Sequence, residues 1–153
     1  MPYALIFGGL RILLDLVPKL ALVGAKLYYS TFFIAFILEV LALIFLIKKY
    51  RSRNHNALEI REALVIGVMF MVVVGSLYAV QSYLFDSYIN PDFQKNTALE
   101  WANLYGKGVE VEELIAENSQ QTSSVFSIFS SILKFSLLGI LISFVVGSIF
   151  KRR

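Results

Sequence analysis

The strongest constraint on this chain is an apolar run from Leu64 to Phe85 that contains no charged side chain. A bilayer core about 30 Å thick needs roughly 20 apolar residues in a helix, and this run is long enough to cross it. Two further runs come close, Tyr29 to Ile47 with Glu39 inside it and Val125 to Phe150 with Lys134 inside it. The sequence therefore predicts an all-α integral membrane protein.

Composition supports this class and argues against an enzyme. The chain is 58% hydrophobic and 16% charged, with a mean hydropathy of +0.70, which is far more apolar than a soluble domain. Because it has no cysteine, disulfides, thiolate metal sites and thiol nucleophiles are excluded. The sequence contains no phosphate loop, dinucleotide fingerprint or zinc-protease motif. We therefore expect no catalytic residue, no cofactor and no metal site.

A fourth span is predicted near the amino terminus, although it is the most polar of the four. Arg11, Asp15 and Lys19 interrupt it at intervals of four residues, so they form one stripe of alternating charge on a single helix face. Such a helix can cross the membrane or lie in its interface as an amphipathic helix. We expect a single membrane domain, residues 1–153, with spans at about 3–25, 29–47, 64–85 and 125–150.

Charged residues outside the spans predict the orientation, because Lys and Arg are retained on the cytoplasmic side. They follow the second and fourth spans, as Lys48, Lys49, Arg51, Arg53, Lys151, Arg152 and Arg153. The loop 86–124 is instead rich in Asp and Glu, and it contains a predicted helix from about Pro91 to Tyr105. We predict that both termini are cytoplasmic and that this loop lies on the opposite side. The basic segments should attract anionic lipid headgroups, and no nucleic-acid partner is expected.

Three segments carry a resemblance to a known family. They are Ile47-Lys48-Lys49-Tyr50-Arg51, Arg61-Glu62-Ala63-Leu64, and Ser82 to Phe93 with its terminal Asn90-Pro91-Asp92-Phe93. Together they resemble an uncharacterised domain-of-unknown-function family of small four-pass membrane proteins common in Bacteroidota. The resemblance implies a bacterial inner membrane, with loop 86–124 in the periplasm, and it implies no activity, substrate or catalytic residue.

Ionisable side chains inside a span cost about 2.5–3.5 kcal/mol each on insertion scales, so each one should have a partner. At 1.5 Å per residue, Arg11 lies about 13 Å into its span and Glu39 about 12 Å from the same side. Asp15 and Lys134 lie about 20 Å and 24 Å from that side. We hypothesise a buried network of Arg11, Asp15, Glu39 and Lys134. It could hold the bundle or a subunit contact together, or line a proton or ion path, unless Lys134 extends to the interface instead.

Small residues form a packing face in the last span, where Gly139, Ser143 and Gly147 recur at every fourth position. Such a face lets another backbone approach closely, within the chain or from another protein. We predict a non-catalytic accessory or interaction subunit that associates through its helix faces with another membrane protein or with itself. The alternative is a small ion- or proton-coupled transporter or channel component that uses the buried charges. The sequence identifies no small-molecule substrate.

Overall fold

The computed structural model of the chain describes residues 2–107, 110–113 and 125–151. These residues are almost entirely helical, which confirms the predicted all-α class. The elements are α1 (Pro2–Leu20), α2 (Ala25–Arg53), α3 (Ile60–Leu84), the π-helix η1 (Phe85–Ile89), α4 (Phe93–Asn103) and α6 (Phe126–Phe150). The helix predicted in loop 86–124 corresponds to α4, and residues 110–113 are also helical. Residues 114–124, Arg152 and Arg153 lie outside the described part of the chain.

Three helical segments are long and apolar enough to cross a membrane, namely Ala25–Arg53, Ile60–Ile89 and Phe126–Phe150. They indicate a multi-pass membrane protein. The second span is longer than predicted, because α2 continues through the basic segment as far as Arg53. The first helix is shorter than predicted and ends at Leu20, and Leu22 then adopts a left-handed conformation with φ of 49° that turns the chain into α2.

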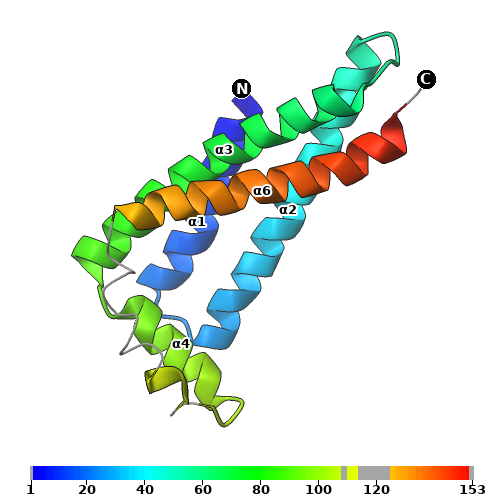
Figure 1. The fold of residues 1–153 in the computed structure, drawn as a ribbon. Coiled ribbons are helices and arrows are strands. Elements are labelled where there is room, and N and C mark those ends of the chain that lie inside the picture. The colour runs from blue at the N-terminus through cyan, green and yellow to red at the C-terminus, as the bar shows by residue number, and fades with distance from the viewer. Residues whose placement is uncertain (1, 108–109, 114–124, 152–153) are drawn as a thin grey trace.

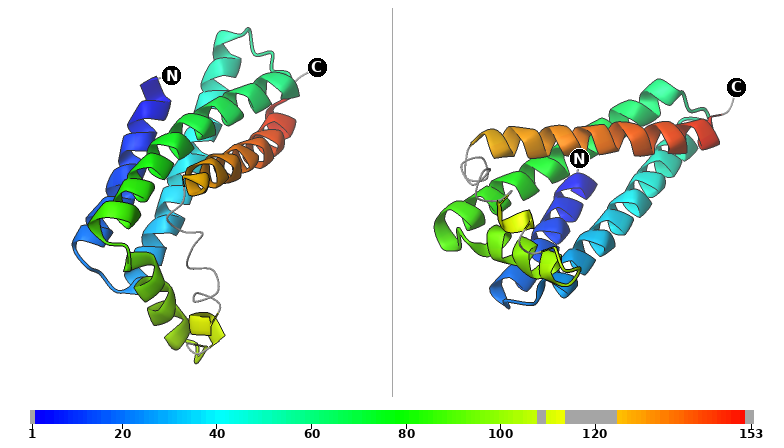
Figure 2. Two further views of the ribbon diagram at one scale, coloured as in Figure 1. Left: turned by 60° about the vertical axis from the view of Figure 1, so that its left-hand side comes forward. Right: turned by 60° about the horizontal axis from the view of Figure 1, so that its bottom comes forward.

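The helices form a bundle with two distinct ends (Figures 1 and 2). The start of α1, the turn between α2 and α3 and the end of α6 lie at the same end of the bundle, which we call the terminal end. The turn between α1 and α2 lies at the opposite end with α4, and we call this the α4 end. The chain therefore runs the length of the bundle four times, with α1 packed against both α2 and α3.

The terminal half of the bundle has an apolar core. Leu43, Met71 and Val74 are completely buried in its main cluster, and a second cluster around Ile47 and Leu58 closes the terminal end. A pocket of about 240 Å³ remains between α1, α2 and α3 in this half, and its lining is almost entirely apolar, from residues such as Ala4, Leu46 and Phe70. The buried charged side chains lie instead between mid-bundle and the α4 end.

Aromatic side chains attach α4 to the start of α2. The rings of Tyr28 and Phe93 lie 5.1 Å apart between centroids, and those of Tyr29 and Trp101 also lie 5.1 Å apart. Phe85 from η1 packs edge-on against Phe93, at 5.8 Å between centroids. This cluster places α4 across the α4 end, beside the polar side chains described below.

The small-residue face predicted in the last span packs against α3. A Cβ added to Gly139 would lie 2.8 Å from the carbonyl oxygen of Gly67, and one added to Gly147 would lie 2.7 Å from the Cβ of Ala63. Ser143 is completely buried in the same contact. The face on Gly139, Ser143 and Gly147 is therefore occupied within the chain.

Candidate functional site

The charged stripe of α1 faces the interior of the bundle. Arg11, Asp15 and Lys19 are only 4%, 3% and 0% exposed, whereas Leu13 and Val17 are each 57% exposed on the outer side. This is the reverse of a water-exposed amphipathic helix, which turns its apolar side chains inward. The stripe therefore forms the core of the candidate site.

The first part of the site is an ion pair near the middle of the bundle. The Nη1 atom of Arg11 lies 3.5 Å from Oε1 of Glu39, and both side chains are buried. The guanidinium lies over the rings of Phe32, Tyr78 and Phe135, at 4.3, 4.8 and 5.5 Å from their centroids. Because these rings belong to α2, α3 and α6, Arg11 contacts every other long helix. The predicted meeting of Arg11 and Glu39 is present in the structure.

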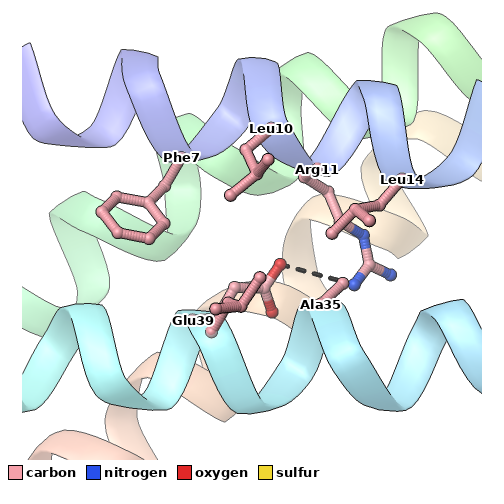
Figure 3. Close-up of a pocket in the computed structure, with 7 residues that line it drawn as sticks. Phe7, Leu10, Arg11, Leu14, Ala35 and Glu39 are labelled. Carbon is pink, nitrogen blue, oxygen red and sulfur yellow. Dashed lines mark ion pairs between the residues drawn. The ribbon is translucent and has the colours of Figure 1, made fainter.

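A small pocket adjoins this ion pair between α1 and α2 (Figure 3). Its volume of about 10 Å³ is close to the minimum that a single water molecule requires. Within the described residues, Oε1 of Glu39 accepts no hydrogen bond of good geometry, although it is near Arg11. The remaining lining is mainly apolar, from Phe7, Leu10, Leu14, Ala35 and Leu38.

The second part of the site is centred on Lys19, closer to the α4 end. Its Nζ lies 2.9 Å from Oδ2 of Asp15 and 3.3 Å from Oδ1 of Asp86, so one ammonium group bridges two carboxylates. The hydroxyl of Tyr28 donates a hydrogen bond of 2.9 Å to the other oxygen of Asp15. A completely buried lysine is stable only when it is paired in this way.

Asp86 links this cluster to α4. Its Oδ2 accepts hydrogen bonds of 3.1 Å from the Ser82 hydroxyl and 3.1 Å from the Gln94 side-chain amide. Two cations, Arg11 and Lys19, thus accompany three carboxylates, which leaves one negative charge in excess when all are ionised. No three His, Asp or Glu side chains in the described ranges are placed to hold a metal ion.

Lys134 is not part of the charge network. It is exposed on α6, and the structure gives no ion pair between it and Arg11, Asp15 or Glu39 in the described residues. The physical reason is the rotation of α6, since neighbouring helical residues point about 100° apart. Phe135 is the residue that faces Arg11, so Lys134 points elsewhere. The hypothesis of a four-residue network is wrong for this member.

Two participants in the network were missing from the sequence hypothesis, Lys19 and Asp86. Lys19 belongs to the stripe on α1, but its second carboxylate comes from η1, far away in the chain. The signal that could have identified Asp86 is its position directly after the uncharged run Leu64 to Phe85. An acid at a span boundary can reach a lysine at the same depth on another helix.

The basic residues predicted to mark one side of the membrane gather at the terminal end. Lys48 lies over the ring of Phe150 at 5.1 Å, and Lys49 lies over Phe45 at 5.5 Å and donates a hydrogen bond to the Tyr3 hydroxyl. Arg51, Arg53 and Lys151 complete this group in the described residues.

Comparison with known proteins identifies a family but no activity. No curated protein and no solved structure matches the chain. Residues 2–152 match the family described as "Protein of unknown function (DUF4199)", so the match includes every helix of the bundle. This confirms the resemblance to an uncharacterised domain-of-unknown-function family, whereas the four passes and the distribution in Bacteroidota stay predictions. The chain belongs to the DUF4199 family of proteins of unknown function.

Proposed function

We propose that this protein is a non-catalytic accessory or interaction subunit of the bacterial inner membrane. The observation that carries the proposal is that its buried ions pair with one another. Arg11 pairs with Glu39, and Lys19 pairs with Asp15 and Asp86, so these groups hold helices together. Charges that pair inside a membrane protein stabilise the packing of its helices.

We further propose that α1 is a fourth span. Its 19 residues correspond to about 28 Å of helix, close to the roughly 30 Å of a bilayer core. A helix in the interface turns its charges toward water, whereas α1 turns them into the bundle and exposes Leu13 and Val17. The gathering of basic residues at the terminal end supports a cytoplasmic position for both termini. The α4 end would then face the periplasm.

A partner would contact the outer helix faces, because the small-residue face of α6 is used by α3. These outer faces carry large apolar side chains, such as Phe33 on α2, which is 69% exposed, and Leu141 on α6, which is 63% exposed. Lipid can cover them as well as a protein can, so burial alone does not identify the contacting face. The contact must therefore be found by experiment.

Site-specific photocrosslinking in native membranes tests the subunit proposal. A photoreactive residue would replace, one at a time, the exposed Leu13, Phe33, Met69 and Leu141 on the four long helices. We expect one of these faces to give a discrete adduct with a single protein, which can be this chain itself, and the others to label lipid. The buried Met71 serves as the control that labels only within the chain. Lipid adducts alone from all four faces would contradict the proposal.

The alternative is a transporter or channel component, for which the buried charges would have to line a path across the membrane. The cluster reaches from Asp86 at the α4 end to Glu39 near mid-bundle. It then meets an apolar region in which Leu43, Met71 and Val74 are completely buried. The pocket of about 240 Å³ in this half also has an almost entirely apolar lining. A polar region that ends halfway supports a structural role for the charges better than it supports a path across the membrane.

Flux measurements separate the two proposals. We expect proteoliposomes containing the full chain to show no more pH- or ion-dependent flux than empty vesicles. Flux that Glu39→Gln abolishes, and that the exposed α4 variant Glu100→Gln retains, would replace the subunit proposal with the transport alternative.

A further inference from the structure

A polar cavity lies at the α4 end, on the side of the charge network that faces α6. Its volume is about 510 Å³, which is within the roughly 300–1,000 Å³ of typical ligand sites. One wall comes from the end of α3, η1 and α4, and the other comes from the first turns of α6. Its polar lining includes Ser82, Asp86, Gln94, Ser130, Ser131 and Lys134.

Opposite charges face each other across this cavity. Asp86 stands on one wall and Lys134 on the other, and in the described chain they form no ion pair with each other. Asp86 also belongs to the cluster that has one negative charge in excess. The cavity thus has a negative wall and a positive wall with space between them.

The negative wall can accept one more hydrogen bond. A carboxylate has about four lone-pair sites, and Asp86 already accepts from Lys19, Ser82 and Gln94. An ammonium group would use the remaining site and offset the excess charge. A simple anion would instead be repelled there.

The positive wall suits a phosphate. Lysine is a common point-charge partner of phosphate, and the hydroxyls of Ser130 and Ser131 on the same helix segment can donate hydrogen bonds to its oxygens. A simple cation would be repelled by Lys134. Only a compact group that carries both signs complements both walls.

We propose that this cavity binds a primary ammonium joined by a short linker to a phosphate, which is the chemistry of ethanolamine phosphate. The ammonium contacts Asp86, and the phosphate contacts Lys134 with Ser130 and Ser131. The group can come from the headgroup of phosphatidylethanolamine or from free phosphoethanolamine. This site is independent of the subunit proposal, since photocrosslinking on the outer faces can fail without affecting it.

Native mass spectrometry of the full chain, released from detergent or nanodiscs, tests the lipid source. Phosphatidylethanolamine is compared with phosphatidylglycerol, which lacks the ammonium, and with phosphatidylcholine, whose nitrogen cannot donate a hydrogen bond. We expect phosphatidylethanolamine to be retained in preference to both. Titration with free phosphoethanolamine, followed by calorimetry, tests the soluble source. Binding of either probe that depends on Lys134 supports the site, and the arm in which it occurs identifies the source.

Substitutions test the contribution of each wall to binding. Lys134→Gln should weaken binding by about tenfold or more, since a hydrogen bond to a charged group contributes about 1.5–3 kcal/mol. The matched control is Lys95→Gln, an exposed lysine on α4, which should leave binding unchanged. Asp86→Asn should remove the preference for phosphatidylethanolamine over phosphatidylglycerol. Because Lys134 is exposed, its variant should fold normally, and a circular dichroism spectrum checks this.

Three results would overturn the proposal. The first is an absence of binding by both probes. The second is an equal loss of binding in Lys134→Gln and Lys95→Gln, which would indicate that binding depends only on the general surface charge. The third is an unchanged lipid preference in a folded Asp86→Asn variant, which would leave no role for the negative wall.

Discussion

The α1–α2 and α3–α6 contacts are held together in opposite ways. Between α1 and α2, buried charges meet, as Arg11 lies 3.5 Å from Glu39. Between α3 and α6, Gly67 and Gly139 lie opposite each other, and their lack of side chains lets the two backbones come close together. Helices in lipid gain little free energy from apolar burial against each other. The α1–α2 contact is instead stabilised by an ion pair, and the α3–α6 contact by close van der Waals packing. The ionic contact should be sensitive to the loss of atoms, and the glycine contact to their addition.

The largest expected effect is the loss of one ion. Glu39→Ala should lower the free energy of unfolding by about 3–5 kcal/mol, because Arg11 is left buried without a carboxylate. The double variant Arg11→Met with Glu39→Met should be close to the wild type, since apolar residues of similar volume can replace a buried pair. Denaturation in mixed micelles, followed by far-UV circular dichroism, measures both. A double variant as unstable as the single one would show that the pair itself stabilises the fold.

The next largest effect is the addition of one methyl group to the α3–α6 contact. Gly139→Ala places a Cβ 2.8 Å from the carbonyl oxygen of Gly67, so α3 has to shift. Overpacking of this kind costs about 1–3 kcal/mol in the same unfolding measurement. Gly9→Ala is the matched control, because its added Cβ has nothing within 4 Å and alanine favours helix. Equal effects of the two substitutions would mean that close backbone approach is unimportant.

Asp15→Asn should lower the free energy of unfolding less, by about 1 kcal/mol. The amide oxygen can still accept a hydrogen bond, so the loss is the difference between a hydrogen bond to a charged group, about 1.5–3 kcal/mol, and one to a neutral group, about 0.5–1.5 kcal/mol. Lys19 keeps a second carboxylate, because Asp86 lies 3.3 Å away. Adding Asp86→Asn removes both carboxylates, and the loss should then exceed the sum of the single losses. Additive losses would indicate that Lys19 does not bridge the two acids.

The smallest effect should come from Ser143→Ala. The hydroxyl is buried against α3, and in the described residues it has no hydrogen-bond partner. Its removal should change the free energy of unfolding by no more than about 0.6 kcal/mol, the average value of an interhelical hydrogen bond in a membrane. A decrease in the free energy of unfolding as large as that of Gly139→Ala would show that the hydroxyl stabilises the α3–α6 contact strongly.

Part of the site was predictable because depth can be counted along a helix. Arg11 and Glu39 were expected at similar depths, and they meet. Lys134 was also counted to a suitable depth, but depth does not specify the direction in which a side chain points. Its neighbour Phe135 occupies the interior position instead. Asp86 was not proposed as a partner, because it lies outside the apolar run that defined the span.

The residues alone are enough to establish a helical membrane protein with three apolar spans, a charged first helix and a face of small residues. These are local properties, since apolar length, helical spacing and side-chain volume depend on neighbouring positions. Only the packed bundle decides that Lys19 bridges Asp15 and Asp86, that Gly139 meets Gly67, and that Lys134 faces the polar cavity. Each of these contacts depends on the order and rotation of helices far apart in the chain, which no local pattern specifies.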